Sequence, residues 1–111
     1  MQQGDIYITD FEPSVGREYK KERPAVIVSG TTAISNSPLI TVMPITSNIK
    51  NKRLDDIAID KNSMNKLHKN SIIRVADIYS FDRKRLKARI GVIENNIMAK
   101  IKSYIPKHFD L

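Results

Sequence analysis

The sequence has no cysteine, no tryptophan and only two histidines. Without cysteine, the chain has no disulfide framework and no thiolate that serves as a nucleophile or a metal ligand. His68 and His108 stand far apart, and neither has a partner at the spacing of a zinc-binding motif. We therefore predict no metal site and no cofactor, and we assign neither histidine a catalytic role.

Long hydrophobic runs are also missing. The longest, such as residues 25–28, are far shorter than the roughly 20 apolar residues of a membrane-spanning helix. The first residues contain neither a basic segment nor an apolar stretch of the length found in secretory signals. These absences predict a protein that does not enter the membrane and that resides in the cytoplasm.

Acidic residues are outnumbered by basic ones. The chain has 19 Lys and Arg against 12 Asp and Glu, which gives a net charge of +7. A basic excess on a small domain favours a polyanionic partner, and nucleic acid is the first choice. The alternative is that the charge only keeps the protein soluble.

Apolar segments separated by turn residues predict a series of short β-strands. The length of 111 residues is that of one domain, so we assign residues 1–111 to a single domain. The predicted strands cover residues 4–11, 24–29, 39–47, 56–60, 71–81 and 87–93.

Two of these strands carry further information. Residues 24–29 are apolar almost without a break, which predicts burial on both faces of a sheet. Pro44 lies near the end of the 39–47 strand, where a missing amide donor is tolerated. The connections at residues 31–37 and 61–70 are polar and predict loops with at most one helical turn each.

A helical period begins after Glu94. The apolar residues that share one face of the predicted helix are Ile97, Met98, Ile101, Tyr104 and Ile105. Pro106 predicts the end of this helix. Several short strands followed by one helix predict an α+β fold that is mainly β, namely a small, strongly bent barrel capped by a helix.

Residues 16–23 form a charged segment directly before the apolar 24–29 strand. The connection is longer than the about two to five residues of an ordinary hairpin loop. Long charged loops held by a rigid strand often carry binding or catalytic groups. This segment is therefore the first candidate for an active site.

Several short motifs follow one another along nearly the whole chain. They are Gly4-Asp5-Ile6, Asp10-Phe11, Gly16 with Glu18, residues 23–29 (RPAVIVS), residues 44–47 (PITS), Ser71, Asp77, Arg85-Leu86 and Gly91. Each motif alone is common. The ordered set at these spacings resembles the MazF/PemK/Kid family of toxin endoribonucleases.

The resemblance implies an SH3-like barrel of five to seven strands with a C-terminal helix, of the CcdB/MazF type, that forms a homodimer. It implies metal-independent cleavage of single-stranded RNA, including mRNA, at short sequences, which blocks translation and growth. In this family the 2′-hydroxyl of the substrate is the nucleophile, and the products carry 2′,3′-cyclic phosphate and 5′-hydroxyl ends. A cognate antitoxin is also implied, with an acidic or apolar tail that covers the RNA groove.

The resemblance implies catalytic roles for Arg23, Thr46, Glu18 and Asp77. A guanidinium at Arg23 suits the charge that grows on the phosphate in the transition state. The hydroxyl of Thr46 suits a phosphate oxygen, and a carboxylate at Glu18 or Asp77 suits proton movement. The residues alone favour a surface arginine at Arg23 and a local turn residue at Thr46, and they leave Glu18 open between a catalytic carboxylate and a solvated loop charge.

The residues expected to bind RNA are Arg17, Tyr19, Lys20, Lys21, Ser47, Lys50 and Arg74. A tyrosine ring stacks on a base and cations contact phosphates. Arg17 stands where some relatives have a histidine, which leaves the general base open. Strand alternation places Arg74 and Asp77 on opposite faces unless a bulge intervenes, and the alternative for Arg74 is an exposed strand cation.

Two other functions remain open on the sequence. One is a CcdB-like toxin that poisons gyrase without cutting RNA. The other is a basic SH3-like module that binds RNA without cleaving it. Incubation with a long single-stranded RNA in EDTA distinguishes both from a metal-independent nuclease.

Overall fold

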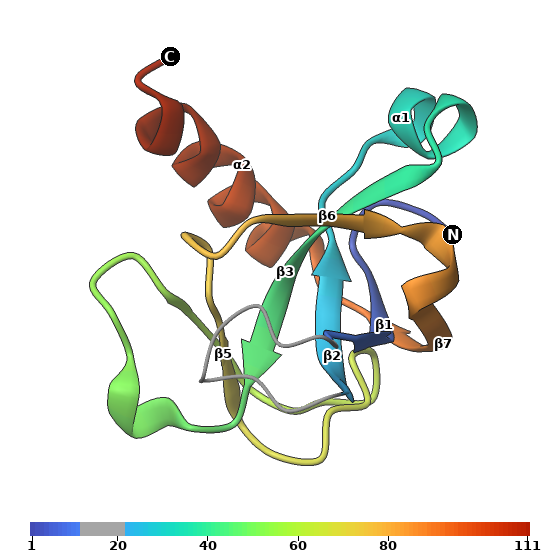
Figure 1. Ribbon diagram of the computed structural model, residues 1–111. Coiled ribbons are helices and arrows are strands. Elements are labelled where there is room, and N and C mark those ends of the chain that lie inside the picture. Colours follow the sequence, from blue (N-terminus) through green and yellow to red (C-terminus); the bar gives the residue numbers. More distant parts are fainter. Residues whose placement is uncertain (12–21) are drawn as a thin grey trace.

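The computed structural model describes residues 1–11 and 22–111 of the chain. Figure 1 shows a strongly curved sheet, with the C-terminal helix on one side and a short helix near the N-terminus of the chain. In chain order the elements are β1 (Asp5–Asp10), β2 (Glu22–Ile27), α1 (Thr31–Asn36), β3 (Leu39–Thr46), η1 (Ile49–Asn51), β4 (Ile57–Ile59), β5 (Ser71–Ile73), β6 (Tyr79–Asp82), η2 (Arg83–Arg85), β7 (Leu86–Val92) and α2 (Asn95–Phe109).

The strands form one seven-stranded antiparallel sheet. Its order is β4-β5-β3-β2-β1-β7, and β6 pairs with the first half of β3. Within the part of the chain that the structure describes, no ladder joins β4 to β7. The predicted fold class, mainly β with a C-terminal helix and five to seven strands, is confirmed, but the sheet is curved and open, not closed into a barrel.

Strand β3 belongs to two parts of the sheet, and Pro44 marks the change between them. Residues 42–44 pair with β2, whereas residues 45–46 pair with β5. Proline offers no amide hydrogen, so it is tolerated where a ladder ends. The predicted place of Pro44 is confirmed, and it coincides with the point at which β3 leaves β2.

Two apolar clusters lie on opposite faces of β1 and β2. Ile6 and Val26 belong to one cluster, Phe11 and Ile27 to the other, and all four side chains are fully buried. Successive side chains of a strand point to opposite faces of the sheet. The unbroken apolar run of β2 therefore meets packed core on both sides, as its sequence predicts.

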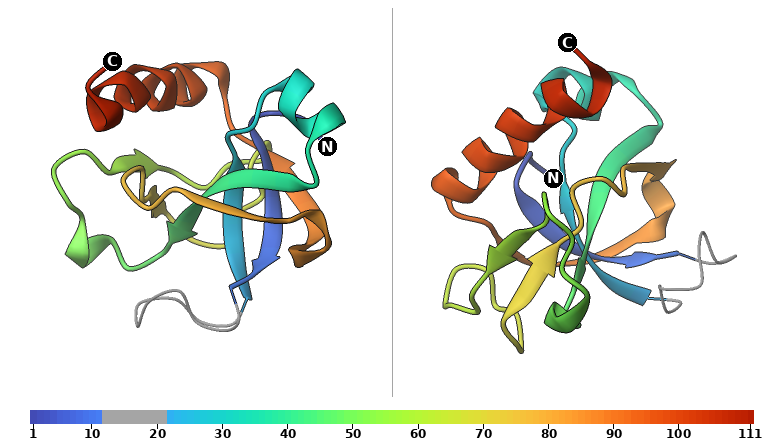
Figure 2. Two further views of the ribbon diagram at one scale, coloured as in Figure 1. Left: turned by 45° about the horizontal axis from the view of Figure 1, so that its top comes forward. Right: turned by 90° about the vertical axis from the view of Figure 1, so that its left-hand side faces the viewer.

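Helix α2 covers the first cluster with the apolar face that its period predicts, and Figure 2 shows it lying across one side of the sheet. Its buried or partly buried residues are Ile97, Met98, Ile101, Tyr104 and Ile105. Ile101 is fully buried. None of the helices in the described residues is both long and apolar enough to cross a membrane.

The prediction that Pro106 ends this helix is wrong, because α2 continues to Phe109. Proline removes one intrahelical hydrogen bond. A side-chain hydrogen bond of 2.7 Å between Tyr104 Oη and His108 Nδ1 spans the same turn. The helix ends at Asp110, which adopts a left-handed conformation with φ 55° and donates its amide to the Pro106 carbonyl.

The single strand predicted at residues 71–81 is in fact two strands. β5 ends at Ile73 and β6 begins at Tyr79, and the two pair with different parts of β3. The turn between them contains a hydrogen bond of 3.1 Å from the Asp77 amide to the Arg74 carbonyl. Arg74 and Asp77 therefore lie in one turn, not on opposite faces of a strand, and Arg74 is 4% exposed, not an exposed cation.

Candidate active site

A cavity of about 670 Å³ opens beside the adjoining ends of β2 and β3. Three segments line it: the ends of these two strands, the loop that follows β3, and residues 67–74, which lead into and out of β5. The residues that line it are Arg23, Pro24, Ile45 and Thr46 from the strands, Ser47, Asn48 and Asn51 from the loop after β3, and Leu67, His68, Lys69, Ser71 and Arg74 from the third segment.

Arg23 and Thr46 lie at the adjoining ends of β2 and β3. Ala25 pairs with Pro44 at the last step of this antiparallel ladder. Arg23 lies two residues before Ala25, and Thr46 lies two residues after Pro44, where β3 pairs with β5. Both residues line the cavity. The structure thus brings together the guanidinium and the hydroxyl that the sequence assigns to one phosphate.

The hydroxyl of Thr46 has a structural role as well as a place in the cavity. Thr46 is 9% exposed, and its Oγ1 accepts a hydrogen bond of 3.2 Å from the Asn48 amide. This is the local turn expected of a threonine at a strand end. A hydroxyl that accepts one bond still has its own hydrogen to donate, so the turn and a contact to a phosphate are compatible.

The described wall of the cavity is cationic. Arg23, Lys69 and Arg74 contribute charged groups, and the described lining residues include no aspartate or glutamate. Such a wall attracts polyanions. Across residues 1–11 and 22–111, no cluster of three or more histidine, cysteine, aspartate or glutamate side chains is placed to hold a metal ion.

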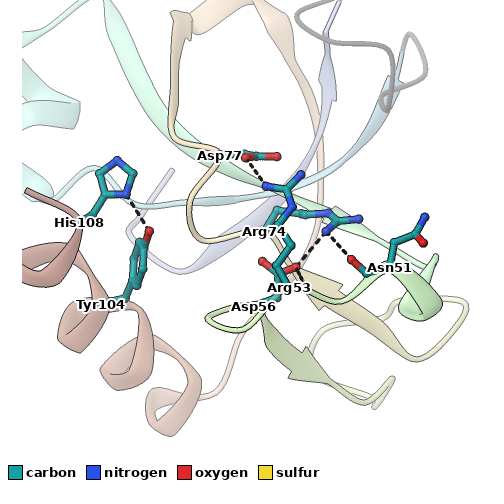
Figure 3. A network of polar contacts seen from close by, with 7 residues as sticks. All are labelled: Asn51, Arg53, Asp56, Arg74, Asp77, Tyr104 and His108. Atoms are coloured by element: carbon teal, nitrogen blue, oxygen red, sulfur yellow. Dashed lines mark hydrogen bonds and ion pairs between the residues drawn. The ribbon is translucent and has the colours of Figure 1, made fainter.

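Arg74 binds the loop between β3 and β4, as Figure 3 shows. Its Nη1 donates to the Asn51 carbonyl at 2.9 Å and to Asp56 Oδ2 at 3.0 Å. The same carboxylate oxygen accepts the amide of Arg53 at 2.9 Å. The side chains of Arg74 and Asp56 are 5% and 0% exposed. Arg74 borders the cavity, but its Nη1 is engaged with the protein itself.

A second ion pair holds the same loop from a more exposed position. Arg53 Nη1 lies 2.8 Å from Asp77 Oδ1, and the two side chains are 41% and 16% exposed (Figure 3). Asp77 is not one of the residues that line the cavity. Arg23 and Thr46 therefore share the cavity lining, whereas Asp77 is paired with Arg53 and is not among the described lining residues.

Tyr104 of α2 lies on the acidic side of this network (Figure 3). Burial, and then the negative charges of Asp55, Asp56 and Asp77, raise the pKa of Tyr104 above its ordinary value. The tyrosine is thus held neutral over a wider pH range than a solvated one.

The other predicted site residues divide into two groups. Ser47 is exposed and lines the cavity, while Lys50 is exposed on η1 beside the lining residue Asn51. The remaining predictions concern Arg17, Glu18, Tyr19, Lys20 and Lys21, and these lie outside the described residues.

The cavity also contains residues to which the sequence pointed weakly or not at all. His68 and Lys69 line it, together with Asn48 and Asn51. In the sequence, the only hint that this polar 61–70 segment belongs to the site is the adjacent pair His68 and Lys69. The local sequence pattern predicts only a loop there. In the structure, the pairing of Ile45 with Ile73 places this loop beside the end of β3.

Comparison with known proteins agrees with this fold. A family model described as a PemK-like, MazF-like toxin of type II toxin–antitoxin systems matches residues 2–109. The chain is also 30% identical over 105 residues to a protein named Endoribonuclease MazF from Staphylococcus saprophyticus. That match covers 95% of this chain and 88% of the relative.

Solved structures share the fold at lower identity. MazF from Deinococcus radiodurans has a TM-score of 0.83 and 15% identity, over 100% of this chain and 97% of that one. A mycobacterial endoribonuclease in complex with its cognate antitoxin has a TM-score of 0.78 and 16% identity, over 100% and 96% of the two chains. The toxin MazF-mt6 from Mycobacterium tuberculosis has a TM-score of 0.76 and 20% identity, over 96% and 97%. By the family model and the sequence relative together, the chain belongs to the PemK-like, MazF-like family of toxins of type II toxin–antitoxin systems.

Proposed function

We propose that this MazF-family toxin is a metal-independent endoribonuclease that cleaves single-stranded RNA at short sequences. The observation that carries the proposal is the cavity in which Arg23 and Thr46 lie on adjoining strands within a cationic wall. The protein would cut mRNA and thereby block translation and growth. Its relative from Staphylococcus saprophyticus is named an endoribonuclease, which supports the same activity.

In the proposed reaction the substrate's own 2′-hydroxyl is the nucleophile. Its oxygen bonds to the phosphorus, the bond to the 5′-oxygen breaks, and the products carry 2′,3′-cyclic phosphate and 5′-hydroxyl ends. Arg23 would stabilise the negative charge that develops on the phosphate oxygens, since a planar guanidinium donates two parallel hydrogen bonds. Thr46 would donate its hydroxyl hydrogen to one of these oxygens.

Proton movement requires a further group. Glu18 and Asp77 are the two carboxylates that the sequence suggests for it. Asp77 is paired with Arg53 and is not part of the lining, so we propose that it holds the loop between β3 and β4. The proton acceptor then belongs either to the Glu18 segment or to the cavity wall.

The remaining partners follow from charge and family. Single-stranded RNA would lie along the cationic wall, with Ser47 and Lys50 at its edge and Arg17, Tyr19, Lys20 and Lys21 on the segment before β2. We propose a cognate antitoxin whose acidic or apolar segment covers the same surface. A mycobacterial endoribonuclease that shares the fold is in complex with its cognate antitoxin, which supports such a partner. We also propose that the chain acts as a homodimer.

The test is incubation of the purified protein with a long single-stranded RNA in EDTA. Site-specific fragments with 5′-hydroxyl ends are expected. Arg23→Ala and Thr46→Ala should each lower kcat by about 100-fold or more, the typical loss when a transition-state donor is removed. Thr32→Ala is the matched control, because Thr32 is exposed on α1 and should leave cleavage unchanged.

Three outcomes would contradict the proposal. RNA that stays intact while gyrase is trapped on DNA would indicate a CcdB-like toxin. RNA that stays intact but is retarded on a gel would indicate a binding module. Cleavage that Arg23→Ala and Thr46→Ala leave unchanged would show that the reaction takes place elsewhere.

A further inference from the structure

We propose that His68 accepts the proton of the attacking 2′-hydroxyl in this toxin. The inference rests on the endoribonuclease function proposed above and names one more group in the same site. His68 lines the cavity that Arg23 and Thr46 line. It comes from the loop between β4 and β5 and is not one of the residues that carry the resemblance to the family.

The chemistry of the cavity wall singles out this residue. Activation of a 2′-hydroxyl needs a group that takes up a proton near neutral pH. The charged groups among the described residues that line the cavity with His68 are Arg23, Lys69 and Arg74, all cationic, and none of them is an acceptor as a cation. Among the described lining residues, His68 alone carries an imidazole, the side chain that most often serves as a general base.

The loop holds His68 in a defined place. Asn65 is 1% exposed, and its Oδ1 accepts the amides of Asn62 at 3.1 Å and Leu67 at 3.0 Å. Its Nδ2 donates to the Asp60 carbonyl at 2.8 Å. Lys66 turns the chain through a left-handed conformation with φ 54°. Leu67 therefore enters the core, 8% exposed, while the next residue stays on the surface.

The two ends of this short segment are fastened as well. On the C-terminal side, Ser71 Oγ donates to the Lys69 carbonyl at 2.8 Å. On the other side, the Met64 carbonyl accepts the Val92 amide at 3.1 Å, which docks the loop against β7. A catalytic group on a surface loop needs this kind of support, because the reacting atoms must be held within about 0.5 Å of their productive geometry.

The proposed step balances without a cofactor. A neutral imidazole nitrogen of His68 takes the 2′-hydroxyl proton as the oxygen–phosphorus bond forms. The bond between the phosphorus and the 5′-oxygen breaks, and the leaving oxygen takes a proton from water. The imidazolium then returns its proton to the hydroxide that is left. Arg23 and Thr46 bind the phosphate throughout and exchange no proton.

The experiment compares His68→Gln with wild type over a series of pH values, using an RNA with one mapped cleavage site. A general base contributes about 100-fold or more, so kcat of His68→Gln should fall by about that factor. The decline of the wild-type rate toward low pH should disappear in the variant. Binding of the same RNA with a 2′-deoxy nucleotide at the cleavage site should stay within about threefold.

Three further variants sharpen the test. His108→Gln is the matched control, since His108 is bonded to Tyr104 on α2 and is not part of the lining; it should cleave as wild type does. His68→Ala should recover part of its rate with imidazole in the buffer. Glu18→Gln should leave the decline at low pH in place.

Specific results would overturn the inference. One is a His68→Gln protein that keeps kcat and the decline at low pH. Another is a rise in KM alone, which would make His68 an RNA contact. A third is loss of the decline in Glu18→Gln, which would make Glu18 the acceptor. In all three cases cleavage by wild type, lost in Arg23→Ala, would leave the proposed function standing, whereas a wild-type protein that cuts no RNA would overturn both.

Discussion

The buried pair of Asp56 and Arg74 predicts a large difference between two neighbouring aspartates. Asp56→Ala removes the oxygen that accepts Arg74 Nη1 at 3.0 Å and the Arg53 amide at 2.9 Å. It leaves the guanidinium of Arg74, whose side chain is 5% exposed, without its counter-charge. Removing one partner of a buried pair costs about 3–5 kcal/mol. Asp55→Ala makes the same charge change at an exposed position and should cost less than about 0.5 kcal/mol.

Urea unfolding of the two variants and of wild type measures this difference. With a slope of about 2 kcal/mol per molar urea, a loss of about 4 kcal/mol lowers the midpoint by about 2 M. Cleavage should fall as well in Asp56→Ala, because Asn51 and the loop after β3 lose their anchor. The reasoning is refuted if the free energies of unfolding of Asp56→Ala and Asp55→Ala lie within about 1 kcal/mol of each other.

Three further predictions concern α2, the loop that carries His68, and alkaline stability. Ile101→Ala should lower the free energy of unfolding by about 2–5 kcal/mol, because the fully buried side chain leaves a cavity under α2; calorimetry or urea unfolding would show a smaller loss if the helix collapses onto the sheet. Gly91→Ala should shift the loop, since its Cβ would lie 2.4 Å from the Asn65 carbonyl oxygen; unchanged stability and unchanged RNA cleavage would contradict this. The raised pKa of Tyr104 gives stability that is complete below about pH 10, where an unfolded tyrosine is neutral, and that is lost as pH rises through the folded pKa. Tyr104→Phe should therefore lose less stability than wild type does between neutral pH and strongly alkaline pH, and an equal loss would argue against the raised pKa.

Local patterns predicted the elements well where burial against the core decides the pattern of apolar residues. The spacing of Ile97, Met98 and Ile101 predicts α2, and each of these residues packs against the same cluster. The unbroken apolar run before Gly30 predicts a strand with core on both sides. In these cases burial alone decides the pattern, so the sequence carries the information directly.

Local patterns failed where a distant strand decides the outcome. Residues 71–81 are apolar and β-rich, yet they pair with two different portions of β3. The chain therefore turns after Arg74, so that β5 pairs with one portion and β6 with the other. Pro106 is a strong local stop signal, but α2 continues past it to Phe109. The split at residues 71–81 is not visible in a window of neighbouring residues, because it depends on β3, which is far along the chain. At Pro106 the stop signal is outweighed, and the Tyr104–His108 bond spans the turn that the proline interrupts.

The sequence by itself determined the family and the fold class, and it suggested Arg23 and Thr46 as partners at one phosphate. These follow from motif order, hydrophobic period and the chemistry of the side chains. Only the tertiary structure placed His68 in the cavity, buried Arg74 against Asp56, and paired Asp77 with Arg53. The physical reason is that strand register acts over long distances in the sequence. The pairing of Ile45 with Ile73 brings the β4–β5 loop to the end of β3, and one residue of slip would send every side chain of β5 to the other face.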